Sequence, residues 1–105
     1  MNFGLTPKQL NEITGILSKY GEIESALIFG SRADGTNEEG SDVDIAIKGE
    51  NLNFLKVSAI KNDFVESYLP YFFDIVDYTH SQNEKLKSHI DFYGIKFYER
   101  EELKT

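Results

Sequence analysis

One stretch of the chain decides the fold: Ala26-Leu-Ile-Phe-Gly-Ser-Arg-Ala-Asp-Gly-Thr-Asn-Glu-Glu-Gly-Ser-Asp-Val-Asp-Ile-Ala-Ile47. It contains two hydrophobic runs, at 25–29 and 42–48, and short hydrophobic runs bounded by turn residues predict buried strands. Between them we expect a short helix that begins at Ser31 and a polar loop over 35–40. Side chains alternate between the two faces of a strand, so Val43, Ile45 and Ile47 should face the core. Asp42, Asp44 and Ala46 should then take the other face.

The two aspartates of this stretch are the first candidate functional residues. Asp42 and Asp44 lie two positions apart, so their carboxylates share one strand face, roughly 6.6 Å apart at Cα. Like charges so placed repel, and a divalent cation such as Mg²⁺ is the usual remedy. The Gly30-Ser31 turn leads into a helix N-terminus, whose backbone N–H groups favour an anion such as phosphate. Together these features indicate nucleotide chemistry. The alternatives are solvated acids on an exposed strand and an ordinary turn capped by Ser31.

A third carboxylate is expected, because two-metal nucleotidyl transfer is rarely supported by two carboxylates alone. Asp74 is the candidate, since it lies inside a hydrophobic run where a charge requires neutralisation. The rival, Asp77, has the opposite strand parity and is expected to cap a turn. Arg32 is a candidate phosphate ligand, or else a solvated surface charge. His80 and His89 have no partners at metal-ligand spacing, and we expect both to be structural or exposed.

The rest of the chain alternates between helical and strand patterns. Thr6 and Gln9 form a capping box before the first helix, and Gly94 is expected to end the last one. The predicted helices cover 7–20, 52–68 and 82–93, and the further strands cover 71–77 and 95–98, before a polar tail over 99–105. The order αβαβαβαβ predicts one α/β (α+β) domain over residues 1–105, with a small mixed sheet of about four strands flanked by helices.

Composition limits the classes of function. The 105 residues include 11 Lys and Arg against 18 Asp and Glu, a formal net charge of −7. Such a chain disfavours direct DNA binding, which depends on basic phosphate contacts, and favours a basic protein partner. There is no cysteine, no signal peptide and no apolar run of membrane-spanning length. We therefore expect a soluble, cytoplasmic protein.

A resemblance to a known family rests on these same residues. Gly30-Ser31-Arg32-Ala33, Gly35, Ser41-Asp42-Val43-Asp44-Ile45 and Asp74-Ile-Val-Asp77 look like the minimal nucleotidyltransferases (MNT) of the DNA polymerase beta superfamily. The resemblance runs from the first strand to about Tyr98. It implies the nucleotidyltransferase fold, with Mg²⁺ (or Mn²⁺) held by Asp42, Asp44 and Asp74, the last also a general base. It further implies that Gly30 and Ser31 grip the phosphates of ATP, the substrate.

Short members of that family are commonly encoded with a helical HEPN protein as a toxin–antitoxin pair. The resemblance therefore implies an antitoxin that transfers AMP from ATP to a tyrosine of its HEPN-type toxin. One alternative is a small-molecule adenylyltransferase like those that modify aminoglycosides, with an acceptor pocket completed by a second subunit. Another is a non-catalytic antitoxin that neutralises its partner by binding, although such a protein has no need to concentrate three carboxylates. The sequence leaves a homo-oligomer and a hetero-oligomer equally open.

Overall fold

Capping residues set where the helices of this protein begin. The computed structural model describes residues 2–101. The Thr6 hydroxyl accepts a hydrogen bond from the Gln9 backbone N–H at 3.1 Å, and the Gln9 side chain accepts one from the Thr6 N–H at 3.0 Å, which confirms the predicted capping box. Asn53 and Asn83 cap two later helices through their side-chain oxygens. The helices are α1 (Pro7–Ser18), α2 (Ser31–Asp34), α3 (Phe54–Glu66) and α4 (Glu84–Tyr93).

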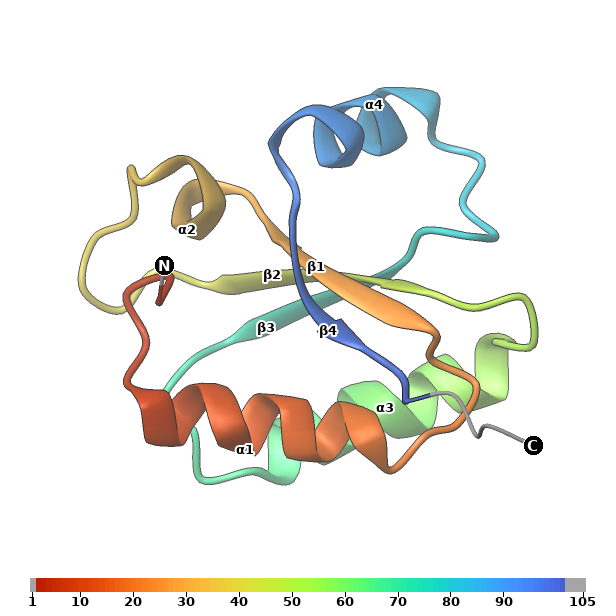
Figure 1. Cartoon of the computed structure of the whole chain (residues 1–105), viewed down its shortest axis with the longest axis horizontal. Helices are drawn as coiled ribbons and strands as arrows, with labels where there is room; N and C mark the ends of the chain where they lie inside the picture. The colour runs from red at the N-terminus through yellow and green to blue at the C-terminus, as the bar shows by residue number, and fades with distance from the viewer. Residues whose placement is uncertain (1, 102–105) are drawn as a thin grey trace.

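The strands alternate with these helices in the predicted order (Figure 1). They are β1 (Ser25–Phe29), β2 (Val43–Lys48), β3 (Phe73–Asp77) and β4 (Ile95–Glu99). They form one mixed sheet in the order β3-β2-β1-β4, in which β1 is antiparallel to β2 and β4 while β2 and β3 are parallel. The predicted fold class, an α+β fold with a four-stranded mixed sheet, is therefore confirmed.

Several predicted boundaries differ from those of the structure. The first helix ends at Ser18, two residues before the predicted end. The helix predicted over 52–68 covers only Phe54–Glu66, because Asn53 caps its start and Ser67 is already extended, with φ −69° and ψ 161°. It therefore ends before Pro70 rather than at it. Asp42 directly precedes β2 instead of lying within it. Of the predicted polar tail, Glu99 belongs to β4 and residues 102–105 lie outside the described residues.

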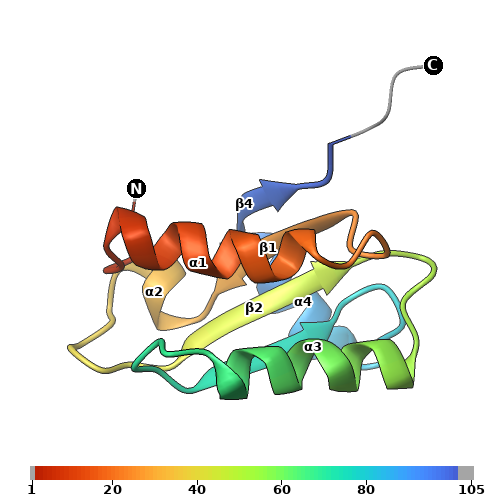
Figure 2. The same cartoon turned by 90° about the horizontal axis from the view of Figure 1, so that it is seen from below.

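The sheet separates a large hydrophobic core from a smaller one. Helices α1 and α3 lie side by side under one face, and α2 and α4 lie on the opposite side (Figures 1 and 2). The large core joins α1 and α3 to the sheet through Ile13, Leu17, Ile60, Phe64, Val43, Ile45 and Ile47. Under α4, a smaller cluster is built on Phe29, Ala46 and Ile90. The predicted alternation of side chains along β2 is thus confirmed. Fewer buried side chains cover the face of the sheet that carries Asp44 and Asp74 than cover the opposite face.

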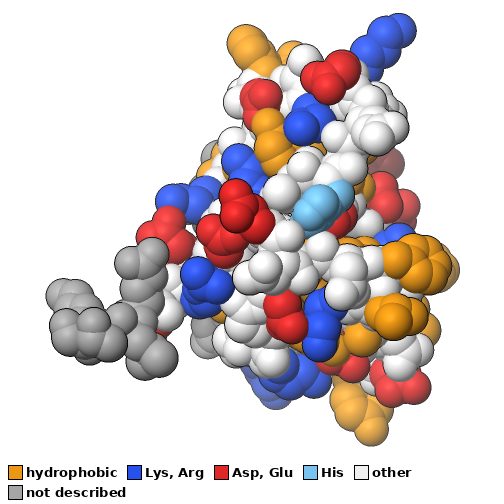
Figure 3. Space-filling view, turned by 90° about the vertical axis from the view of Figure 1, so that its right-hand side faces the viewer, with side chains coloured by type: hydrophobic (Ala, Val, Ile, Leu, Met, Phe, Trp, Pro, Cys, Tyr) orange, Lys and Arg blue, Asp and Glu red, His pale blue; other side chains and the backbone are white. Residues whose placement is uncertain are grey.

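The surface mixes charges of both signs. On the face that looks to the right in Figure 1, acidic and basic side chains are interspersed, and hydrophobic side chains gather toward one edge (Figure 3). Among residues 2–101, no helix is long and apolar enough to cross a membrane.

Candidate active site

The parallel pairing of β2 and β3 brings two of the predicted carboxylates side by side. Asp44 and Asp74 are register partners on these adjacent strands, and neighbouring strands lie about 4.8 Å apart. Asp42 stands at the end of the preceding loop, two residues before Asp44. Asp44 is half-buried, whereas Asp42 and Asp74 are exposed. Because β3 is an edge strand, Asp74 reaches water, so its position inside a hydrophobic run does not make it buried.

The charges of Asp42 and Asp74 act on Asp44. Burial raises the pKa of Asp44 above its ordinary value, and the negative charges of Asp74 and Asp42 raise it further. The positive charges of Arg32 and His89 partly oppose this rise in the pKa. Asp44 is therefore the centre of a group of charges drawn from β2, β3, α2 and α4.

Gly30 places the start of α2 against Asp44. Its φ of +71° and ψ of −152° lie in a region that only glycine adopts without strain. A Cβ at this position would stand 2.2 Å from Oδ2 of Asp44, closer than any real contact allows. Phe29, the residue before it, is the register partner of Asp44 across β1 and β2. The structure thus brings Gly30 and Ser31, the predicted phosphate-binding residues, next to the carboxylates.

Arg32 is buried, so it is not the solvated surface charge that the sequence left open as an alternative. Its side chain is only 3% exposed. The guanidinium donates hydrogen bonds to the backbone carbonyls of Phe3, at 2.9 Å, and Ser41, at 2.7 and 3.2 Å, with a longer one to Asp42 at 3.3 Å. It also lies over the Tyr71 ring, 4.7 Å from the ring centroid. Arg32 therefore holds the loop that presents Asp42, and its role in binding phosphate stays a prediction.

Asp77 and His89, two residues near the site, are placed as the sequence predicted, one as a turn cap and the other exposed. Asp77 accepts hydrogen bonds from the backbone N–H of His80 at 3.2 Å, which matches its predicted role as a turn cap. His89, by contrast, is exposed on α4 with its charge close enough to Asp44 to lower that residue's pKa. The packing of α4 brings the His89 ring against Phe29, and no local spacing of histidines in the sequence encodes this contact.

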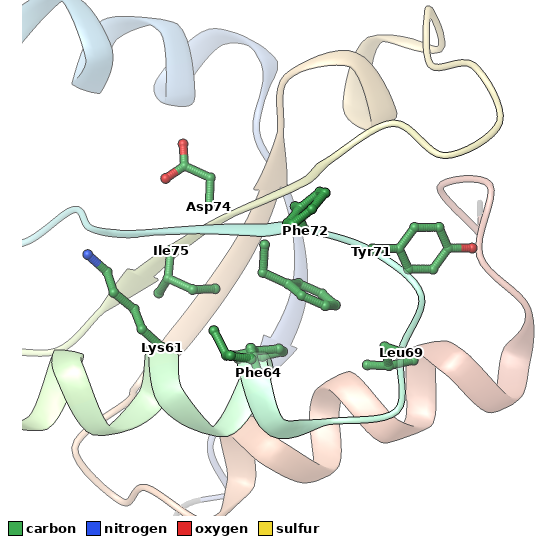
Figure 4. A pocket seen from close by; sticks show the side chains of 9 residues that line it. Lys61, Phe64, Leu69, Tyr71, Phe72, Asp74 and Ile75 are labelled. Atoms are coloured by element: carbon green, nitrogen blue, oxygen red, sulfur yellow. The ribbon is translucent and has the colours of Figure 1, made fainter.

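An apolar hollow beside β3 is distinct from the carboxylate site. It has a volume of about 390 Å³ and is lined by α3 and the chain that enters β3. Figure 4 shows Lys61, Phe64 and Ile75 on one side of β3 and the Asp74 carboxylate on the other. Asp74 therefore borders this pocket through its strand, while its carboxylate faces α4 and Asp44.

Comparison with known proteins identifies the family. The family model described as "Polymerase beta, Nucleotidyltransferase" matches residues 11–103. The chain belongs to this nucleotidyltransferase family. The family resemblance seen in the sequence is thereby confirmed. A search of curated proteins gave no match.

Solved structures with the same fold include toxin–antitoxin proteins. One, described as a toxin–antitoxin with AMP-PNP, is 25% identical with a TM-score of 0.70, over 83% of this chain and 70% of that one. A MntA-HpeT toxin–antitoxin mutant with two aspartates changed to glutamate is 22% identical with a TM-score of 0.69, over 83% and 70% of the two chains. A putative nucleotidyltransferase from Sulfolobus solfataricus is 23% identical with a TM-score of 0.52, over 89% and 77%.

The donor set of this nucleotidyltransferase suits a hard divalent cation. Carboxylate oxygens are the ligands that Mg²⁺ and Mn²⁺ prefer, and the mutual repulsion around Asp44 is the kind that a cation relieves. Within residues 2–101, no three acidic or histidine side chains are already drawn together as a metal-binding group. The fit therefore rests on the chemistry and electrostatic coupling of the carboxylates, and the metal site stays a prediction.

Neutralising Asp44 should stabilise the protein when no divalent cation is available. A raised pKa in the folded state means that the ionised carboxylate opposes folding, so the free energy of unfolding falls as pH rises above the ordinary aspartate range. In EDTA at pH 7, Asp44→Asn should therefore raise the melting temperature, and the difference should shrink towards pH 3. Glu39→Gln, in the exposed loop, controls for the change in net charge. An Asp44→Asn variant no more stable than Glu39→Gln at pH 7 would contradict the coupling.

Replacing Arg32 should damage the loop that carries Asp42. Lysine keeps the charge but cannot donate to three carbonyls in the same planar geometry, so Arg32→Lys should lower the free energy of unfolding by about 2–3 kcal/mol. Urea denaturation measures this directly. Arg100→Lys is the matched control, because exposed Arg100 donates one side-chain hydrogen bond, to the Gly21 carbonyl at 2.7 Å. Equal stability losses in the two variants would show that the buried contacts of Arg32 are not special.

Proposed function

We propose that this nucleotidyltransferase transfers AMP from ATP to a hydroxyl, that of a tyrosine, on a HEPN-type toxin, and so acts as its antitoxin. What supports the proposal is the pairing of Asp44 with Asp74 on adjacent strands, with Gly30 packed against Asp44 and Asp42 two residues before it. The neighbour at 25% identity, described as a toxin–antitoxin with AMP-PNP, supports both a toxin partner and a nucleotide of this class.

In this proposal, one set of residues binds the cation and another binds the phosphates. Asp42, Asp44 and Asp74 would hold Mg²⁺ or Mn²⁺, which when bound supplies charge neutralisation for the triphosphate and favours loss of the acceptor's proton. The backbone at Gly30 and Ser31, with the Ser31 hydroxyl, would bind the phosphates of ATP. Arg32 keeps Ser41 and Asp42 in place through their carbonyls, and its charge adds to the positive potential beside Asp44.

The transfer step is an in-line displacement at the α-phosphorus. The acceptor oxygen forms a bond to that phosphorus while the bond to the oxygen that leads to the β-phosphate breaks. AMP is left on the acceptor and pyrophosphate departs. Because a tyrosine hydroxyl has a pKa near 10, its proton must be removed as the new bond forms. Asp74 is the proposed acceptor of that proton, since it is the exposed carboxylate beside Asp44.

Charge supports a protein acceptor. The net charge of −7 favours a basic partner by long-range attraction, and an RNA-cutting toxin would be basic. The small-molecule alternative would need an acceptor pocket, and the apolar hollow beside β3 lies on the other side of that strand from the Asp74 carboxylate (Figure 4).

Removing the proposed proton acceptor should stop transfer and spare the complex. The protein encoded by the neighbouring gene would be incubated with this nucleotidyltransferase, ATP and Mg²⁺, and its intact mass followed. Asp74→Asn should slow the addition of AMP by about 100-fold or more, the usual contribution of a general base. Asp77→Asn is the matched control, because Asp77 lies on the same strand with its side chain on the opposite face.

Each other outcome of this experiment favours a different function. An unmodified neighbour together with adenylylation of a small hydroxyl compound would promote the small-molecule enzyme. A tight complex in which ATP is never consumed would promote a non-catalytic antitoxin. Equal rates for Asp74→Asn and the wild type would remove Asp74 from the mechanism.

A further inference from the structure

Three aromatic side chains form a continuous surface on α4. The His89 and Tyr93 rings lie 4.9 Å apart between centroids, at an interplanar angle of 43°. Phe92 meets Tyr93 edge-on at 4.8 Å. Phe92 is 81% exposed and Tyr93 44% exposed, and His89 is exposed as well. We call these three residues the α4 shelf. A contiguous exposed patch of rings is a feature typical of binding surfaces.

The shelf starts at the active site. His89 packs edge-on against Phe29, with ring centroids 6.3 Å apart. Phe29 pairs with Asp44 across the strands and directly precedes Gly30. Hydrogen bonds from Thr36 lower the pKa of Asp34, at the end of α2, and the charge of His89 adds to this; the same charge partly opposes the rise in the pKa of Asp44. The shelf therefore runs outward from the carboxylates on the side of the sheet that α2 and α4 share (Figure 1).

The opposite flank of α4 is already engaged with the protein. The Tyr78 hydroxyl donates to Asp91 at 2.5 Å, and the Lys87 ammonium lies 4.9 Å from the Tyr78 ring centroid. Each helical residue turns by 100°, so Asp91 projects roughly 200° away from His89. Ile90, between them, is buried on the sheet. His89 is therefore on the flank of α4 that faces Phe29, whereas Phe92, about 200° from Ile90, points away from the sheet.

We propose that the α4 shelf stacks against the base of the nucleotide substrate, an inference that rests on the proposed function. The phosphates are charged and suit the Gly30-Ser31 turn, whereas a base is flat, mostly uncharged and matches an aromatic surface. With the phosphates beside Asp44, the shelf is an exposed aromatic surface on that side of the sheet, and Phe29 and His89 connect it to Asp44. Stacking accepts any base, so the shelf governs affinity more than the choice of base.

A fluorescent nucleotide tests the shelf without any transfer reaction. The triphosphate of 2-aminopurine riboside would be titrated in Mg²⁺ with the whole chain and no partner, because stacking quenches its fluorescence. The wild type should quench the probe, and Phe92→Ala and Tyr93→Ala should each weaken its binding by about tenfold, within the range for loss of one stacking ring. Tyr93→Phe, which keeps the ring, should bind normally.

Two controls separate the shelf from the rest of the site. Phe54→Ala removes an equally exposed ring, at 83%, from α3 on the other face of the sheet, and should change nothing. Inorganic tripolyphosphate should compete equally well in the wild type and the shelf variants, since it has no base. Unchanged probe affinity in both alanine variants would show that the shelf does not bind the base. So would a loss of tripolyphosphate affinity as large as the loss of probe affinity. Either result would leave the proposed function standing. A wild type that binds no nucleotide would overturn both.

Discussion

The whole site depends on the confinement of one carboxylate. Asp44 is held between Gly30, whose missing side chain leaves space for Oδ2, and Asp74, its neighbour on the parallel strand β3. Burial and repulsion from Asp74 and Asp42 raise its pKa, so the native state accepts an electrostatic cost at this point. A fold carries such a cost where function requires it and compensates elsewhere. Here the compensation comes from the hydrophobic core on the opposite face of the sheet.

One face of the sheet carries most of the hydrophobic core, and the other carries the candidate site. Most fully buried side chains belong to the layer that α1 and α3 form with the sheet, including Ile13, Leu17 and Ile60. The other face has only the small cluster around Ala46 and Ile90, and beside it lie the carboxylates, the Gly30 turn and the α4 shelf. Buried Arg32 connects the N-terminal turn, the loop before β2 and the entry to β3. A small protein can in this way keep a rigid frame under a site that is largely exposed.

Local patterns in the sequence predicted the strands and the capping box at Thr6, because each depends on a few adjacent residues. The proximity of Gly30 to Asp44 was predictable because the two strands that carry the motif follow one another and pair. The parity of β3 correctly separated Asp74 from Asp77. The burial of Arg32 left no such signal, because it depends on the Phe3 carbonyl, 29 residues away, and on the shape of the loop that ends at Ser41. Nor did a local pattern place His89 at the site, since only the packing of α4 over Phe29 brings that ring there. Long-range contacts of this kind leave no periodic signal in one sequence.

The central claim is that a divalent cation and a nucleotide meet at the carboxylates between β2 and β3. Paramagnetic broadening of backbone NMR signals by Mn²⁺, in the presence of a non-hydrolysable ATP analogue, tests it most directly. The account predicts that the amide signals of Gly30, Ser31, Asp44 and Asp74 disappear at low Mn²⁺, while those of α1, on the far face of the sheet, persist. Broadening spread evenly over the acidic surface, or confined to the loop that carries Glu38 and Glu39, would contradict it.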